Sequence, residues 1–296
     1  MFSTKEEREI ENAIGKFMML PVSELIEFKD HPFPVVDDED MYELQESIRD
    51  NGLMDPILVF LNEDGQLEII SGHRRAYVYD NLGIETIPAI VKNITRDDAT
   101  VIMTDTNFKT RKQIPPSVKA KAYEMTFQAL KRQGKRTDLL GEDTINSRDE
   151  ITKKPDVTDS SRQIGMYRRL NYLIPQLLNL VDQGRIKLRP AVELSFIRPD
   201  SQKEIYNFYE EYDSTPSHAQ AKMLRELDKN NILTQDKILE ILKKPKETQE
   251  KPFTLSEGLR AKYFSDCITQ KDMENKIIRA LKLLETQERI ESGISR

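Results

Sequence analysis

The chain contains few of the residues that build metal and redox sites. Its 296 residues include one cysteine, Cys267, and three histidines far apart in the sequence, His31, His73 and His218. A single cysteine excludes an internal disulfide, a CxxC redox pair and a cysteine-based zinc site. The histidines form neither an HExxH motif nor another metal-ligand cluster. No run approaches 18 uncharged apolar residues, and the N-terminus shows no apolar signal-peptide core. We therefore expect a cytoplasmic protein with no membrane partner and no structural metal.

The composition is typical of a water-soluble chain with real cores, since 38% of the residues are apolar and 32% are charged. The length favours two or three domains. The net charge of -6 hides a segregation of the two signs. Residues 37–50 hold seven acids and one base, residues 109–136 nine bases and one acid, and residues 162–190 six bases and one acid. A basic middle in an acidic chain favours a polyanion partner, although basic side chains can also simply solvate helix faces.

The first part of the chain mixes strand and helix signals. Acids crowd the first turn of the segment 37–52, its apolar residues follow helical spacing, and Gly52 provides a stop. Apolar runs of strand length flank a turn that contains Gly65. In chain order we predict a short strand and turn over 19–28, a helix over 37–52, a strand over 56–60, a turn over 62–65, a strand over 66–70, a helix over 72–82, a strand over 86–91, and a helix that Thr95 caps.

Strand signals vanish after residue 108, and apolar residues then recur at helical spacing. A polar stretch beginning near residue 241 has the composition of a linker, and a stripe of apolar residues from Met273 to Leu284 follows it. The stripe fits either packing within the chain or a dimer contact. The expected fold class is α+β, with a small mixed α/β domain, an all-helical domain and a short helical C-terminal segment. The predicted boundaries are a tail over 1–16, the α/β domain over 17–108, the helical domain over 109–240, a linker over 241–252 and the C-terminal segment over 253–296.

The segment from Ser71 to Arg75 is the strongest candidate site. A strand runs into Ser71 and Gly72, and a helix starts there. Helix N-termini expose unpaired N–H groups with partial positive charge, and glycine lets a ligand approach the backbone closely. Arg74 and Arg75 add two guanidinium groups suited to phosphate. The pattern predicts binding of a di- or triphosphate, against the alternative that the arginines face solvent and His73 packs or donates a hydrogen bond.

A second candidate is the segment 160–170, which is typical of a DNA recognition helix. Ser160 can cap it, and Ile164 and Tyr167 can bury one side. Arg162, Gln163, Arg168 and Arg169 can face outward, and the predicted DNA-binding residues of this helix are these four together with Ser160 and Ser161. Arginine and glutamine are suited to guanine and adenine edges in the major groove. The supporting helix would lie over 149–154. A core helix with an exposed arginine edge is the competing interpretation.

Several ordered motifs resemble the ParB-type family of chromosome and plasmid partition proteins. Those of the N-terminal part are Leu20-Pro21-Val22, Phe28-Lys29-Asp30-His31-Pro32-Phe33, Asn51-Gly52-Leu53, Pro56-Ile57, Ile69 to Arg75 and Gly83 to Pro88. Further likeness covers Ala129 to Leu139, Leu173 to Leu178, Pro190 to Ser195 and Thr215-Pro216-Ser217. The resemblance runs from about residue 17 to 230.

The resemblance implies a ParB-like CTP-binding N-terminal domain and a central helix-turn-helix domain. By this likeness Ser71, Gly72, His73, Arg74 and Arg75 hold the triphosphate. His31, Pro32 and Phe33 lie by the nucleotide, and Asn107 assists with nucleotide and Mg²⁺. The segment after Asn107 departs from the family pattern, because Lys109 stands where glutamine is usual and Arg111 is shifted by one position. This departure leaves open whether CTP is hydrolysed, as in a weak CTPase that works as a clamp switch.

The resemblance also implies a partition protein that binds a centromere-like palindrome in double-stranded DNA as a homodimer, responds to CTP and associates with a nucleoid or plasmid. Its backbone-phosphate contacts would come from Lys131, Arg132, Lys135 and Arg136, with a basic loop in solvent as the alternative. A partner ParA-type ATPase is an open question. Two alternatives remain: a nucleotide-dependent phosphotransferase on the same fold, with Glu68 as the carboxylate base nearest in sequence, and a ParB-like transcription regulator or nucleoid-occlusion factor.

Overall fold

The computed structural model describes residues 15–53, 55–138, 151, 159–244, 257–264 and 269–291. The chain divides into two compact units, residues 1–245 and residues 246–296. The predicted tail over 1–16 lies almost wholly outside the described residues, and its last two residues, Gly15 and Lys16, lead into the first strand.

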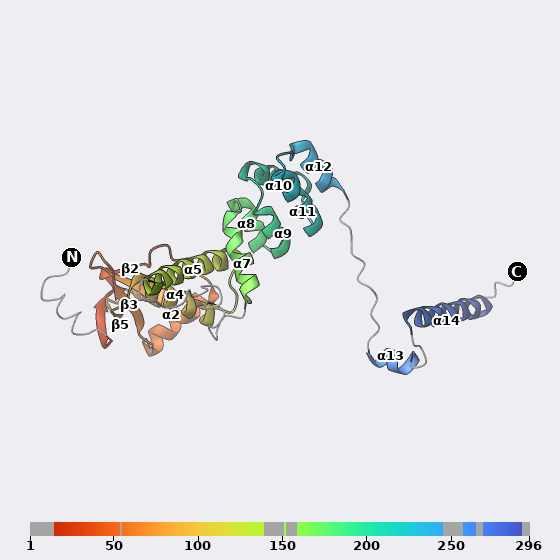
Figure 1. The fold of residues 1–296 in the computed structure, drawn as a ribbon. Coiled ribbons are helices and arrows are strands. Elements are labelled where there is room, and N and C mark those ends of the chain that lie inside the picture. The colour runs from red at the N-terminus through yellow and green to blue at the C-terminus, as the bar shows by residue number, and fades with distance from the viewer. Residues whose placement is uncertain are drawn as a thin grey trace. The chain divides into compact units, whose positions relative to one another are not determined.

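The first unit begins with a five-stranded sheet in the order β1-β5-β3-β4-β2. Strands β2, β3 and β5 of this sheet are labelled in Figure 1. The strands are β1 (Phe17–Pro21), β2 (Leu25–Ile26), β3 (Ile57–Leu61), β4 (Leu67–Ser71) and β5 (Thr86–Lys92), and the 3-10 turn η1 (Val22–Glu24) joins the first two. Strands β3 and β4 form an antiparallel hairpin, β3 and β5 run parallel, and β1 runs antiparallel to β5. These strands confirm the three predicted from apolar runs to within one residue at each end.

Capping residues set the helix boundaries in this domain. Helix α2 (Glu39–Asn51) begins where the Asp38 carboxylate accepts a hydrogen bond from the N–H of Met41, and it ends at Gly52 with a φ of 70°. Helix α4 (Arg96–Thr110) begins with a capping box between Thr95 and Asp98. Helix α3 (His73–Asn81) follows β4 after a single residue, Gly72. The three predicted helices are thereby confirmed.

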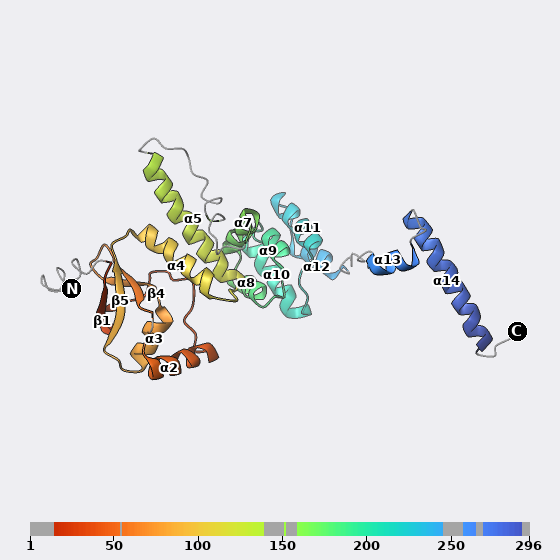
Figure 2. The ribbon, with the colours of Figure 1, turned by 90° about the horizontal axis from the view of Figure 1, so that it is seen from below.

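Helices cover both faces of the sheet (Figure 2). One face packs Ile57, Val59 and Ile87 against α2 and α3. The other packs Phe60 and Ile70 against α4 and against α5 (Pro116–Asp138). Because α5 buries Val118 and Ala122 in this second core, the first helix beyond the predicted boundary at residue 108 is packed on the α/β domain. The boundary itself stays a prediction.

Helices α7 to α12 form a separate hydrophobic core that includes Leu177, Leu194 and Leu224. They are α7 (Ser161–Arg169), α8 (Pro175–Asp182), α9 (Leu188–Leu194), α10 (Pro199–Tyr212), α11 (His218–Lys229) and α12 (Gln235–Lys243), with the 3-10 turn η2 (Leu170–Tyr172) after α7. The described part of this region contains no strand, as the sequence predicts. Of the predicted supporting helix over 149–154 only Ile151 is described, and it is buried beside Tyr123 and Ile164.

Helix α5 connects these two parts of the first unit. Near its N-terminus, the Ser117 amide and hydroxyl donate hydrogen bonds to the Asp182 carboxylate at the end of α8. The Ala120 carbonyl accepts one from the Asn171 side chain at 2.9 Å. Since α5 contributes both to the core under the sheet and to contacts with α7 and α8, it is the element through which the two parts meet.

Helix α12 continues to Lys243, with Ile241 and Leu242 buried, so the first residues of the predicted linker belong to a packed helix. The rest of that stretch lies outside the described residues, apart from Lys244. The second unit contains α13 (Glu257–Tyr263) and α14 (Gln270–Glu291). On α14 the side chains of Ile278, Leu281 and Leu284 are at least half exposed. Within the described residues no helix combines the length and apolar character that a membrane crossing requires.

Candidate functional site

The turn at Gly72 opens into a cleft of about 550 Å³ between α2, α3 and the C-terminal end of α4. The predicted site residues Ser71, Gly72, His73, Arg74, Arg75, His31 and Asn107 all line it. Pro32 and Phe33, predicted to lie by the same ligand, do not line the cleft: both are buried, and Phe33 belongs to the core beneath α4. The structure therefore brings together seven of the nine predicted nucleotide-binding residues at one surface.

Only glycine fits at position 72. Its φ of 103° lies in the left-handed region, and a Cβ atom at this position would come within 2.5 Å of Ile57 Cγ2. This conformation turns the chain directly from β4 into α3, so that the first turn of α3 faces the cleft. Because no side chain caps this helix, its first N–H groups remain available to an anion.

Three guanidinium groups line the cleft, from Arg74, Arg75 and Arg111. Arg74 Nη2 donates to Asp38 Oδ1 at 2.8 Å, while its Nε is buried and has no hydrogen-bond partner. Arg75 Nη1 donates to the backbone carbonyls of Asp55 and Pro56, so this arginine also holds the loop before β3. An incoming phosphate oxygen would accept from the orphaned Arg74 Nε and would compete with Asp38 for the same guanidinium.

Arg111 lies in the cleft although the sequence pattern places it one position late. Its Nε donates to Asn107 Oδ1 at 3.2 Å and its Nη2 to the Pro34 carbonyl at 3.2 Å. Burial, and then the nearby Arg74 cation, lower the pKa of Arg111. Repulsion between these two cations would fall when an anion binds between them. Asp38 and Arg111 belong to the site, although neither is among the predicted nucleotide-binding residues. At Asp38 the sequence indicates only a helix cap.

His31 and His73 stack on each other with ring centroids 3.8 Å apart. Burial, followed by the Arg111 cation, lowers the pKa of His31 to about 4. Burial, followed by His31 and Arg111, lowers the pKa of His73 to about 3. Both rings are therefore neutral at pH 7, and His73 Nε2 accepts a hydrogen bond from the Phe28 amide at 3.4 Å. His31 Nε2 is buried without a partner, the second orphaned polar atom at this site.

Asn107 is the predicted magnesium ligand. Its amide nitrogen donates to the Met103 carbonyl at 2.9 Å, and its Oδ1 accepts from Arg111. In the part of the chain that the structure describes, no group of three or more His, Cys, Asp or Glu side chains could hold a metal. A Mg²⁺ ion here would depend on the oxygens of a bound phosphate and on water, as Mg²⁺ commonly does.

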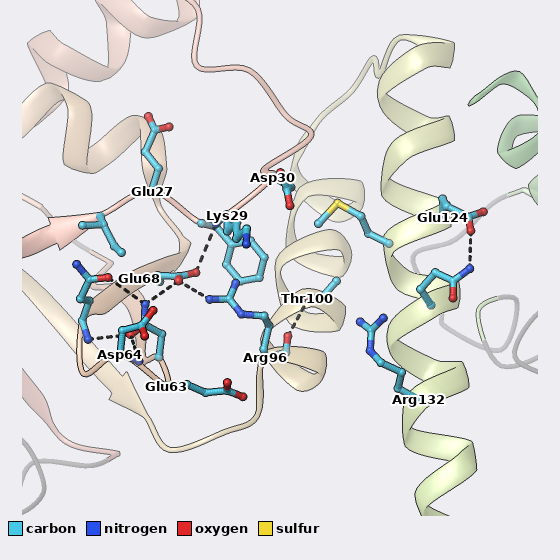
Figure 3. Close-up of a pocket in the computed structure, with 16 residues that line it drawn as sticks. Glu27, Lys29, Asp30, Glu63, Asp64, Glu68, Arg96, Thr100, Glu124 and Arg132 are labelled. Carbon is cyan, nitrogen blue, oxygen red and sulfur yellow. Dashed lines mark hydrogen bonds and ion pairs between the residues drawn. The ribbon is translucent and has the colours of Figure 1, made fainter. Parts of the chain in front are cut away.

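A larger cleft of about 660 Å³ lies elsewhere on the α/β domain, between the β3–β4 hairpin, the start of α4 and α5 (Figure 3). It shares no lining residue with the cleft at Gly72. Glu68 is buried at this second cleft, where Asn62 Nδ2 donates to it at 2.9 Å and Arg96 forms an ion pair with it. Burial alone would raise the pKa of Glu68, but the bonds from Arg96 and Asn62 hold it below its ordinary value. Glu68 therefore cannot serve as a base beside phosphates at Gly72, which corrects the expectation for the phosphotransferase alternative.

The predicted recognition helix forms as α7, with Ser160 as its N-cap. Arg162 and Gln163 are exposed, but the Gln163 carbonyl oxygen accepts from the Ser160 amide and hydroxyl and so completes the capping box. Ser161 lies in the first turn and is half-buried. Of the polar residues at this helix start, Arg162 is the one with an exposed cationic side chain.

Arg168 and Arg169 do not face outward as predicted. Arg168 Nε donates to Glu124 Oε2 at 2.8 Å, and its guanidinium lies 3.4 Å from the centre of the Phe127 ring. Arg169 donates to Ser195 Oγ and O, at 3.1 and 2.8 Å. The guanidinium groups of both arginines therefore already have partners, on α5 for Arg168 and at the end of α9 for Arg169. Because α7 packs against both helices, its last turn has little exposed surface.

The backbone-phosphate candidates on α5 differ among themselves. Lys131 is exposed. Arg132 is paired with Asp97, with 2.6 Å between Nη2 and Oδ1. Lys135 and Arg136 lie on α5, but their side chains are outside the described part of the structure. DNA contact by any of these residues stays a prediction.

Three comparisons with known proteins bear on this arrangement. Residues 4–108 match the family model of the ParB N-terminal domain. The nucleoid occlusion protein of Geobacillus thermodenitrificans is 33% identical over 162 residues, which cover 50% of this chain and 56% of that protein. The chain thus matches about half the length of the curated relatives it resembles.

Similar solved structures include two of the chromosome-partitioning protein ParB from Caulobacter crescentus, both C-terminally truncated. One, complexed to the centromeric parS site, is 18% identical, with a TM-score of 0.42 and coverage of 71% of this chain and 98% of that one. The other, complexed with CTP-gamma-S, is 21% identical, with a TM-score of 0.31 and coverage of 61% and 92%.

The sheet order and the cationic cleft define a small α/β domain with a glycine-led turn, followed by a helical part that shares helix α5 with it. Over residues 4–108 this part of the chain is similar to the ParB N-terminal domain.

Proposed function

We propose that the chain is a CTP-responsive DNA-binding protein that binds the nucleotide's triphosphate at the Gly72 turn. The observation that carries the proposal is the orphaned Nε of Arg74, buried in a cleft that it shares with Arg75, Arg111 and the uncapped start of α3. The three cations, of which Arg74 is paired with the Asp38 carboxylate, form a surface complementary to several phosphate charges. The choice of CTP among nucleotides follows from the likeness of residues 4–108 to the ParB N-terminal domain, and Mg²⁺ would be held by the phosphates with Asn107 as the nearest side-chain ligand.

Isothermal titration calorimetry with CTP and Mg²⁺ tests this proposal. Arg74→Ala should weaken CTP binding about 10- to 100-fold, the effect of losing one or two charge-assisted hydrogen bonds. The matched control is Arg49→Ala, which removes an exposed arginine from α2 that pairs with Glu46 one turn away. Equal affinity in wild type and Arg74→Ala would contradict the site, and no heat with CTP, ATP, GTP or UTP would contradict nucleotide binding altogether.

Duplex DNA is the proposed macromolecular partner, bound through the basic helical part. Arg162 at the exposed start of α7 and Lys131 on α5 are the described side chains best placed for it. A homodimer is proposed from α14, whose exposed Ile278, Leu281, Leu283 and Leu284 have no covering partner within the described residues of their unit. Selection of bound duplexes from a random pool, with and without CTP and Mg²⁺, tests both ideas, because a dimer should select a palindrome.

The role in the cell has two candidates. Partition is the first, with a ParA-type ATPase as its partner. Nucleoid occlusion is the second, favoured by the name of the curated relative at 33% identity. Mapping of bound sites over the whole genome separates them: sites confined to one region fit partition, whereas dispersed sites fit nucleoid occlusion. A weak CTPase activity belongs to either candidate and would be measured as phosphate release with the selected duplex.

A further inference from the structure

Between the cleft at Gly72 and the start of α7 lies an unbroken series of contacts. It begins at Arg111, whose guanidinium carbon is 5.4 Å from the centre of the Phe33 ring. Phe33 meets Phe108 edge-on at 5.9 Å, and Phe108 stacks on Tyr123 of α5 at 4.8 Å with only 18° between the planes. These three rings, Phe33, Phe108 and Tyr123, are called the ring column. Since Arg111 lines the cleft, the column starts at the wall of the nucleotide site.

The column ends in a polar clamp at the N-terminus of α7. Tyr123 donates its hydroxyl hydrogen to Asp159 Oδ2 at 2.7 Å, and Lys119 Nζ lies 2.7 Å from the same oxygen. Asp159 is buried and immediately precedes Ser160, the cap of α7. Burial, and then the bond to Asp159, raise the pKa of Tyr123, so this hydroxyl keeps its proton and remains a donor. The clamp therefore fixes where α7 begins relative to α5.

A cavity of about 780 Å³ runs beside this series, lined by Arg111, Phe108, Tyr123 and Asp159 among others. Close-packed cores hold side chains in single positions, whereas rings beside open volume can change rotamer at lower cost. Arg111 contributes to the walls of both this cavity and the nucleotide cleft. A movement of Arg111 toward a bound phosphate would remove its charge from the Phe33 face and open space for Phe108.

We propose that Tyr123 and Asp159 are positioning residues that transmit occupancy of the nucleotide cleft to the start of helix α7, through Arg111 and the ring column. The inference rests on the proposed function, because it assumes that the cleft binds a nucleotide. The ligand shifts α7 only if it makes different contacts in the two arrangements. Arg111 would supply that difference, because its bonds to Asn107 and Pro34 would be exchanged for bonds to phosphate in a filled cleft. Adjacency alone does not establish coupling, so the test measures coupling directly.

The experiment is hydrogen–deuterium exchange of the full chain with and without CTP-gamma-S and Mg²⁺, alongside calorimetry. In the wild type the nucleotide should change amide exchange over residues 161–169 at least threefold. Tyr123→Phe removes only the hydroxyl; it should bind CTP-gamma-S within twofold of wild type and yet lose the response at α7. Asp159→Asn, which keeps the size of the side chain, should lose the same response. Tyr206→Phe is the matched control, because it removes a tyrosine hydroxyl that bonds Glu210 on α10, and it should respond as wild type does.

The outcomes separate the inference from the function on which it rests. A full α7 response in Tyr123→Phe, or a wild type that binds the nucleotide without any change at α7, overturns the relay and leaves nucleotide binding intact. A merely structural clamp would raise exchange at α7 in the variant both with and without ligand, and would leave the ligand-dependent difference unchanged. Absence of nucleotide binding in calorimetry overturns the proposed function, and the relay with it.

Discussion

The turn at Gly72 and helix α7 each carry two adjacent arginines, at the start of α3 and at the end of α7, but the fold treats the two pairs differently. At the turn, Arg74 and Arg75 both line one cleft, and a donor of Arg74 is left without a partner. On α7, Arg168 is paired with Glu124 and Arg169 is hydrogen-bonded to Ser195, so both already have partners on neighbouring helices. The first pair is placed by the backbone immediately before it. The second is placed by residues tens of positions away in the sequence, so its surroundings cannot be judged locally.

The largest effect in this comparison should come from Gly72→Ala. The new Cβ meets Ile57 Cγ2 at 2.5 Å while the backbone keeps a φ of 103°, and the two costs together should reach about 2–4 kcal/mol of unfolding free energy. CTP affinity should fall at the same time, because the start of α3 must shift. Urea unfolding and calorimetry measure the two effects.

Gly83→Ala is the control for that change. Gly83 also has a positive φ, 67°, but nothing lies within 4 Å of a Cβ built there. Gly83→Ala should lower the unfolding free energy by about 1–2 kcal/mol, from backbone strain alone, and should leave CTP affinity unchanged. If the two variants proved equally stable and equally able to bind CTP, the close approach to Ile57 would have no consequence, and the turn would not be specific to glycine.

Most of the α/β domain could be predicted from sequence because its signals are local. Asp38 and Thr95 cap helices, Gly52 ends one, and apolar runs of five residues form the strands. The cleft was predictable only in part. Arg111 reaches it because α4 ends where its side chain can cross to Asn107 and Pro34, which depends on the docking of α4 on the sheet. Burial of Phe33 rather than contact with a ligand is likewise a tertiary effect, set by α4 and α5.

A second prediction sharpens the contrast on α7 itself. Arg168→Ala should lower the unfolding free energy by about 1–3 kcal/mol, because it leaves Glu124 short of its charge partner and uncovers the Phe127 ring. Arg162→Ala, at an exposed position, should change stability by less than about 0.5 kcal/mol. Its effect should fall on DNA affinity instead, with a larger loss for the selected duplex than for an unrelated one.

These two variants are each other's control, measured by urea unfolding and by duplex titration at one fixed salt concentration. Equal losses of stability would mean that the contacts of Arg168 contribute nothing. An equal loss of affinity on selected and unrelated duplexes would reduce Arg162 to a contact with the DNA backbone.

The last prediction concerns the two stacked histidines of the cleft. His31 and His73 in the cleft have pKa values lowered to about 4 and about 3, below the ordinary 6.5, so between these values the unfolded chain binds more protons than the folded one. Stability should therefore fall as the pH falls below 6.5, by up to about 1.4 kcal/mol per pH unit for each histidine. Urea unfolding between pH 7 and pH 5 measures how steeply the unfolding free energy depends on pH. His73→Gln should reduce this slope by the contribution of one histidine. An unchanged slope in His73→Gln would show that His73 is protonated in the folded protein at pH 5, and the neutral stacked pair at the cleft would then be the wrong description of this site.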